Sequence, residues 1–268
     1  MKIRLLKDMI TLKEQDSLVK FIYSREQTEG GFSFSKTTPP TLEDTYFALR
    51  LLEELDKCSV NKSTVSYIQS LNINDIKIPK HFYQITNIYR IANLSDKLKI
   101  VKDRIIFNNK IILNTLADLY YLVLTKENLN ISIALTENEK NILTSAQKQN
   151  IKSMEEYKQF VTIMKKLHIS FQQKEYSQRI KASQNSDGGF GLVQNSTSFL
   201  EPTYHALEAL KELDTTPKNI HKCERFVYSC MTQVSGFGRQ MITVPSLEYS
   251  YYAIVSLKII DVMKKVTE

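Results

Sequence analysis

The sequence predicts an all-α fold, an α/α toroid in which six helical hairpins form an inner and an outer ring. Three observations lead to this prediction. Every glycine falls in one of three turn-like clusters, one helix-like segment recurs six times, and strongly apolar segments alternate with amphipathic ones. Such a repeat has no obvious internal boundary, so residues 1–268 are predicted to form a single toroid domain.

The glycine clusters mark the turns of three hairpins. They read "GGF" at 30–32, "GGFG" at 188–191 and "GFG" at 236–238, and together they hold all seven glycines of the chain. Each cluster follows a helix-like segment that contains a glutamine, and each precedes a second helix-like segment, as expected for helix ends and turns. The phenylalanine that follows the glycine in each cluster is predicted to fasten its turn onto the helices: Phe32, Phe190 and Phe237.

The helices that follow the clusters align with one another. They read "TLEDTYFALRLLEEL" from Thr41, "FLEPTYHALEALKEL" from Phe199 and "SLEYSYYAIVSLKII" from Ser246. Their shared tyrosine is called the anchor position here, and three weaker copies of the segment lie between them. The six anchors are separated by 37, 37, 38, 46 and 47 residues and are occupied by Tyr46, Tyr83, Tyr120, Lys158, Tyr204 and Tyr251.

Each anchor helix is preceded by an amphipathic segment with one apolar stripe. These segments lie at about residues 13–26, 60–71, 97–108, 136–149, 172–184 and 217–232. The anchor helices are apolar nearly all round, which is typical of helices buried on more than one side. The anchor helices are therefore assigned to the inner ring and the amphipathic helices to the outer ring. Residues 1–12 are predicted either to dock a partner or to form a helix that covers the edge of the barrel.

Composition excludes several classes of protein. Hydrophobic residues make up 42% of the chain and charged residues 24%, as in globular proteins. No apolar run approaches the roughly 18 residues of a membrane-spanning helix, so a cytoplasmic protein with at most peripheral membrane contact is expected. The net charge of +7 comes from scattered lysines, and no nucleic-acid partner is expected. The three cysteines lack disulfide or zinc spacing, and we expect them to be reduced.

The hairpin pattern "Q-x-x-x-GGFG … S-LE-x-T-Y-x-AL-x-AL" resembles the repeat of protein prenyltransferase β subunits and of squalene and class II terpene cyclases. Residues 30–55, 184–213 and 233–260 carry the resemblance most strongly. The resemblance implies the α/α toroid fold and a central cavity that binds an isoprenoid. One fold hosts many activities, so the chemistry has to be argued from individual residues.

The zinc site of the prenyltransferases is predicted to be absent. Those enzymes hold zinc with a D-x-C at the start of one inner helix and a histidine in a later one. The matching stretch here, Asp44-Thr45-Tyr46, has tyrosine in place of cysteine, and Pro202 and Tyr249 replace the histidine. The four histidines fall in different repeats without ligand-like spacing, so no metal ligand is predicted among His81, His168, His205 and His221.

The class II cyclases place D-x-D-D-T at the same helix start, and "TLEDT" at 41–45 resembles it. The resemblance implies that Glu43 and Asp44 are catalytic, because two adjacent carboxyls in an apolar cavity share a proton that can be passed to an alkene. The same residues also fit a capping pattern. Thr41 with Asp44 has the hydroxyl and acid spacing of an N-terminal helix cap, which needs no substrate.

The anchor tyrosines are predicted to line one end of the inner ring. Aromatic rings there suit an isoprenoid or a cation, and they suit packing between helices equally well. The candidate substrate-binding residues are Tyr46, Tyr83, Tyr120, Tyr204 and Tyr251.

Two functions remain open. The first is an isoprenoid-handling, terpene cyclase-like protein that works by protonation, without a cofactor, unless a diphosphate substrate brings Mg²⁺. The second is a non-catalytic toroid that binds a lipid, a peptide or a partner protein. Cyclases pair this toroid with a second domain and prenyltransferase β subunits pair it with an α subunit, so a protein partner that closes the toroid is also expected.

Overall fold

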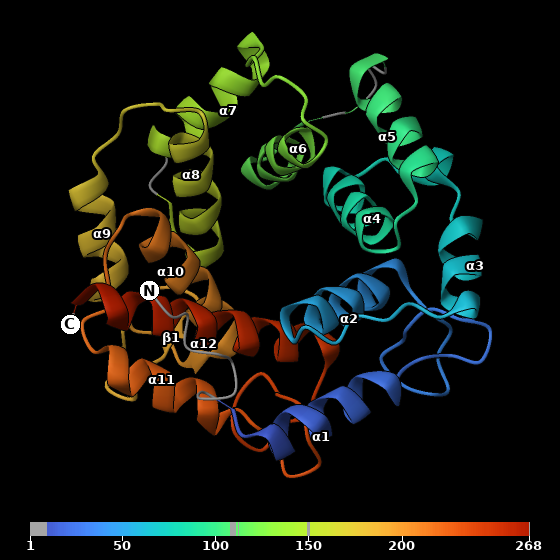
Figure 1. Cartoon of the computed structure of the whole chain (residues 1–268). Coiled ribbons are helices and arrows are strands. Elements are labelled where there is room, and N and C mark those ends of the chain that lie inside the picture. The colour runs from blue at the N-terminus through green and yellow to red at the C-terminus, as the bar shows by residue number, and fades with distance from the viewer. Residues whose placement is uncertain (1–9, 108–110, 112, 149–150, 268) are drawn as a thin grey trace. The chain divides into compact units, whose positions relative to one another are not determined.

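The computed structural model describes residues 10–107, 111, 113–148 and 151–267. In this part of the chain the regular secondary structure is almost entirely helical, as predicted (Figure 1). The described helices include none with both the length and the hydropathy needed to cross a membrane. Residues 1–9 of the predicted docking segment lie outside the described residues; Ile10 is buried, and the first helix begins at Leu12.

The chain divides into two compact units. The central unit comprises residues 24–150, and the terminal unit comprises residues 151–268 together with the chain up to residue 23. The central unit contains α2 (Leu42–Glu54), α3 (Lys62–Ser70), a short 3₁₀ helix (Ile73–Asp75), α4 (Pro79–Ile91), α5 (Ser95–Phe107), α6 (Leu116–Asn128) and α7 (Glu137–Lys148).

The terminal unit has the same plan. Its elements are α1 (Leu12–Tyr23), α8 (Met154–Lys166), α9 (Gln173–Ala182), β1 (Phe190–Gly191), β2 (Ser198–Phe199), α10 (Leu200–Glu212), α11 (Ile220–Ser229) and α12 (Leu247–Thr267). The six amphipathic segments and the six anchor helices are therefore helices, with ends within a few residues of the expected ones except for the longer α12. The two short strands were not expected; they pair antiparallel across one glycine turn.

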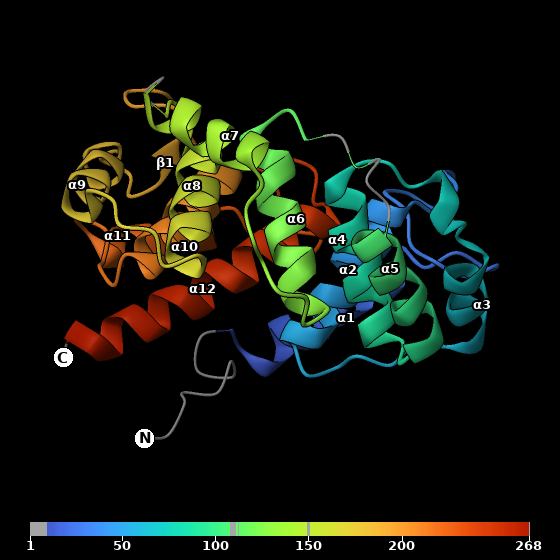
Figure 2. The ribbon, with the colours of Figure 1, turned by 90° about the horizontal axis from the view of Figure 1, so that it is seen from above.

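Within each unit, three anchor helices pack side by side. In the central unit α4 lies between α2 and α6, while α5 packs on α4 and α7 packs on α6 (Figure 2). In the terminal unit α10 lies between α8 and α12, with α9 and α11 packed against them. The anchor helices bury far more side chains than the helices that precede them: α8 buries residues along its whole length, whereas α9 buries only Tyr176 and Ile180.

The glycine turns are built alike in the three strong repeats. Phe32, Phe190 and Phe237 are buried, as expected. The backbone N–H of each donates to the hydroxyl of the residue just before the next anchor, at 2.9 to 3.0 Å. These acceptor hydroxyls belong to Thr45, Thr203 and Ser250. The turn is thereby fixed to the first turn of its own anchor helix.

The helix caps follow the predicted pattern, with one difference. Thr115 with Asp118 and Ser153 with Glu156 form full capping boxes at α6 and α8. At α2, Thr41 accepts from the Asp44 N–H, but the N–H of Thr41 itself donates to the Phe32 carbonyl of the glycine turn. The Asp44 carboxylate therefore does not accept from the Thr41 N–H, as it would in a full capping box, and it can accept from other donors.

Candidate functional site

The predicted acid pair at the start of α2 is separated into two local networks. Glu43 Oε1 lies 2.5 Å from the Lys80 ammonium of α4, and the Glu43 side chain is 48% exposed. The Glu43 carboxylate is therefore engaged in an ion pair at a half-exposed position, and not in a dry, apolar cavity. This geometry disfavours Glu43 as the proton donor.

Asp44 acts at the helix end. Its Oδ2 accepts from the Thr41 hydroxyl at 2.8 Å, and the Asp44 N–H donates back to that hydroxyl at 2.9 Å. Partial burial raises the pKa of Asp44 and the neighbouring Glu43 charge adds to the rise, while the Thr41 hydroxyl and the Phe34 backbone N–H oppose it. The capping interpretation of Asp44 therefore fits the structure directly.

The anchor tyrosines form packing contacts within each unit. The ring centroids of Tyr46 and Tyr83 lie 6.0 Å apart, and those of Tyr204 and Tyr251 lie 6.2 Å apart. Tyr83 is half-buried, whereas the other four candidate tyrosines, including Tyr120, are only 6 to 7% exposed. These rings mainly fill the space between anchor helices, and little of their surface is open to a ligand.

A row of three glutamates lies beside this tyrosine layer in the terminal unit. Glu155, Glu201 and Glu248 each stand three residues before an anchor, on the neighbouring helices α8, α10 and α12. All three side chains are half-buried. They are called the glutamate row below.

Each glutamate of the row is paired with the residue four positions later on its own helix. Gln159 Nε2 donates to Glu155 at 3.0 Å, and the Tyr252 hydroxyl donates to Glu248 at 2.9 Å. His205 Nε2 lies 3.8 Å from Glu201 Oε1. Residues four apart share one helix face, so a polar side chain stands beside the carboxylate in all three helices, with a hydrogen bond at Glu155 and at Glu248.

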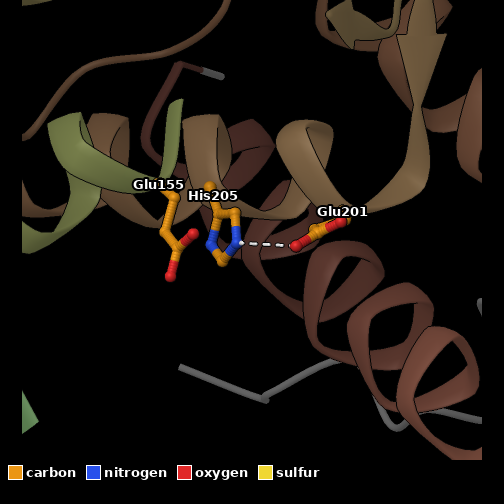
Figure 3. Close-up of side chains that lie close together, drawn as sticks. All are labelled: Glu155, Glu201 and His205. Atoms are coloured by element: carbon orange, nitrogen blue, oxygen red, sulfur yellow. Dashed lines mark ion pairs between the residues drawn. The ribbon is translucent and has the colours of Figure 1, made fainter. Parts of the chain in front are cut away.

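His205 is the most enclosed member of this region. It is 6% exposed, its ring lies 5.2 Å from the Tyr204 ring, and its Nδ1 has no hydrogen-bond partner among the described residues. Figure 3 shows the imidazole between the carboxyl groups of Glu155 and Glu201. Burial lowers the pKa of His205, and the charge of Lys158 lowers it further, against the opposing effect of Glu201.

Lys158 occupies the anchor position of α8, where five other repeats have tyrosine. Its Nζ lies 4.6 Å from the centroid of the Tyr204 ring and donates to the Tyr204 hydroxyl at 3.4 Å. Burial lowers the pKa of Lys158, while the carboxylates of Glu208, Glu155 and Glu201 oppose that shift. The site therefore combines several carboxylates, one imidazole and one buried amine.

The central unit has no matching acidic row among its described residues. The same position three residues before the anchor holds Glu43, Lys80 and Ala117, and the first two neutralise each other. The acidic character is therefore a property of the terminal unit.

The sequence interpretation did not select the glutamate row. The signal was present, because the fourth, fifth and sixth repeats read "SMEEYK", "FLEPTY" and "SLEYSY", each with Glu three residues before the anchor. His205 was set aside because only spacing between histidines was considered. Glu201 lies four residues before it, and Glu155 reaches it from another helix, so that ligand atoms of the three residues all lie within 4.8 Å of one another.

Comparison with protein families covers most of the chain. Residues 99–250, more than half of the sequence, match the ribophorin II N-terminal domain. Residues 2–90 match the prenyltransferase alpha-alpha toroid domain. No curated protein matches the sequence significantly. The chain therefore belongs to the ribophorin II N-terminal domain family, and its mostly helical fold is of the α/α toroid type.

Proposed function

We propose that this protein is a non-catalytic α/α toroid that binds a positively charged segment of a partner protein at the glutamate row. One observation carries the proposal: three neighbouring anchor helices present Glu155, Glu201 and Glu248 at the same helical position, each half-buried and each oriented by a residue of its own helix.

Electrostatics favours a cationic ligand. The chain as a whole carries +7, so an acidic surface in the terminal unit is a local exception. The carboxylates lie next to buried aromatic rings, and a cation is attracted more strongly there than in open water. Burial and the charges of Glu248 and Glu201 raise the pKa of Tyr249, while the charge of Arg239 opposes the rise.

The orientation of the carboxylates lowers the cost of binding. Gln159 and Tyr252 already restrict the rotamers of Glu155 and Glu248 through hydrogen bonds, and His205 lies beside Glu201. A ligand therefore has less side-chain entropy to overcome when it binds.

Hydrocarbon binding has weaker support. An isoprenoid chain needs a dry, apolar surface, but the half-buried surface around the row is made of carboxylates and the tyrosines beside it are occupied in packing. The Lys80 partner of Glu43 also removes the main support for alkene protonation.

The isoprenoid-handling function remains the second candidate, supported by the prenyltransferase domain match over residues 2–90. In that case Glu43 and Asp44 would be the acids, and Mg²⁺ would enter only with a diphosphate substrate. Incubation of the purified chain with polyprenyl diphosphates of several lengths, followed by extraction and analysis of the products, tests this candidate. Product formation that is lost in Glu43→Gln would replace our proposal.

Peptide binding tests the proposed function directly. Fluorescent peptides of equal length, rich in lysine and arginine, in glutamine or in glutamate, are titrated with the protein in the presence of a chelator. We expect only the basic peptide to bind, more weakly as salt is raised. The double variant Glu201→Gln/Glu248→Gln should weaken binding at least about tenfold, or about 1.4 kcal/mol.

The matched control is Glu175→Gln/Asp214→Asn. It removes two exposed carboxylates from the same unit, so the net charge changes equally away from the row. Equal losses in the two double variants, or equal binding of the neutral peptide, would contradict the proposal.

A further inference from the structure

We propose that Glu155, Glu201 and His205 form a binding site for a divalent transition-metal ion such as Zn²⁺ or Mn²⁺. The site bridges two neighbouring anchor helices, since Glu155 lies on α8 and the other two residues lie on α10. The inference does not rest on the proposed function, because the metal alone tests it.

The three ligand atoms are close to the spacing that a metal requires. All lie within 4.8 Å of one another. Bonds of about 2.0 to 2.2 Å from a metal to nitrogen or oxygen place tetrahedral ligand atoms about 3.3 to 3.6 Å apart. The two glutamate side chains, both half-buried, therefore have to move toward the imidazole when a metal binds.

The second observation is the imidazole itself. His205 is 6% exposed, and its Nδ1 has no hydrogen-bond partner in the described part of the chain. Figure 3 shows the ring between the two carboxyl groups. A buried polar atom without a partner lowers stability, and coordination of a metal by that atom would remove this cost. A neutral imidazole is the form that binds metals, and histidine is the commonest metal ligand in proteins.

The donor set decides the class of metal. Two carboxylates with one imidazole suit Zn²⁺, Mn²⁺ or Fe²⁺, whereas Ca²⁺ and Mg²⁺ prefer oxygen alone and Cu⁺ prefers sulfur. Three protein ligands leave a further coordination position for water or a bound ligand.

Lys158 opposes the metal. Its Nζ lies 4.6 Å from the ring centroid of Tyr204, the residue directly before His205, and an ammonium group there repels a bound cation. Removing this charge while keeping an apolar stem should strengthen metal binding. Lys158→Met should therefore bind the metal more tightly than the native chain does. A variant that failed to fold could not give this result.

The experiment is a titration of the full chain with Zn²⁺ by calorimetry and with Co²⁺ by visible absorption. We expect one equivalent to bind, with Co²⁺ absorption bands of a nitrogen and oxygen site. Glu155→Gln and Glu201→Gln should each weaken binding at least about tenfold, which is about 1.4 kcal/mol, and Lys158→Met should tighten it. His221→Ala, which removes an exposed histidine of the same unit, should have no effect.

Circular dichroism of each variant establishes that it is folded. No binding to the native chain, or equal binding by Glu155→Gln and the His221→Ala control, would overturn the inference. The peptide titration contains a chelator and tests only the proposed function, whereas the metal titration contains no peptide and tests only the metal site. A negative result in one therefore does not affect the other proposal. If both hold, Zn²⁺ and the basic peptide should compete, because both use Glu201.

Discussion

Buried polar side chains recur at one position of the repeat, directly after the anchor on the middle helix of each unit. In the terminal unit this residue is His205, and in the central unit it is Gln84. Gln84 is 1% exposed, and neither its Nε2 nor its Oε1 has a hydrogen-bond partner among the described residues. A buried amide without partners costs stability that an apolar side chain of similar shape would not.

Replacement of Gln84 by methionine should therefore stabilise the protein. We expect Gln84→Met to raise the free energy of unfolding by about 1 to 2 kcal/mol, measured by urea denaturation. The matched control is Gln159→Met at the same repeat position of α8. Its amide donates to Glu155, so this change should destabilise the protein or leave its stability unchanged. Destabilisation by Gln84→Met would mean that the amide has a partner, and would contradict the account.

Individual roles were predictable where the partner is local in sequence. The cap at Thr41 and Asp44 was visible because its two residues are three apart, a spacing fixed by the geometry of a helix start. The Lys80 partner of Glu43 was not visible, since it comes from another helix 37 residues away. The grouping of Glu155 with His205 was hidden for the same reason.

At the scale of the element, the glycine turn requires a close approach of two backbones. Gly188 has a φ of +97°, and a Cβ there would lie 2.2 Å from the Lys222 backbone at the start of α11. Gly30 has the same conformation and would meet the Ser63 backbone of α3 in the same way. The turn therefore packs directly on the next amphipathic helix, and only glycine leaves room for this contact.

Gly188→Ala should destabilise the protein by about 3 kcal/mol or more, because the positive φ and the backbone overlap both oppose a side chain. Chemical denaturation measures the change. Gly238→Ala is the comparison, since Gly238 does not have a positive φ and its nearest neighbour would be the Thr243 hydroxyl and not a backbone atom. Equal losses for the two variants would show that backbone approach at Gly188 is not the cause.

The ends of α2 and α4 are joined by an ion pair whose effect should depend on pH. Arg90 donates to both carboxylate oxygens of Glu53 at 2.7 and 2.9 Å, and Arg50 adds a contact at 2.8 Å. Burial acts to raise the pKa of Glu53, but the two arginines outweigh it, so this pKa lies below its ordinary value. The pair therefore stabilises the fold above the unfolded-state pKa of about 4.3, and this stabilisation is lost as the pH falls through the folded-state pKa.

Glu53→Gln should reduce stability by about 0.5 to 1 kcal/mol at neutral pH, since the pair is partly exposed and screened. The difference between the native chain and the variant should shrink as the pH is lowered through about 4, and denaturation at several pH values measures it. A difference that stays constant down to the lowest pH would contradict the assigned role of the carboxylate.

At the scale of the whole molecule, the repeat was the part that sequence could predict. The anchor spacing and the glycine clusters located all six anchor helices, because helix period and turn chemistry are local properties. The two-residue strands and the length of α12 were not predicted, since both depend on contacts between segments. The single domain over residues 1–268 remains a prediction; each of its two units is compact by itself.

The units share a fold plan and differ in charge at equivalent positions. The terminal unit has a glutamate three residues before each of its anchors, whereas the central unit has Glu43, Lys80 and Ala117 there. Positions that pack between helices need similar side chains in every copy of a repeat. Half-buried positions can hold side chains of different charge without disturbing that packing. This difference in charge is the basis for assigning function to the terminal unit.

Carbodiimide cross-linking to a lysine-rich peptide tests that assignment most directly, because the reagent joins a carboxylate to an amine in contact with it. Mass spectrometry then identifies each carboxylate linked to the peptide. The account predicts links at Glu155, Glu201 and Glu248, reduced by excess unreactive arginine-rich peptide. Links confined to acids of the central unit, or spread evenly over exposed acids such as Glu137 and Glu175, would contradict it.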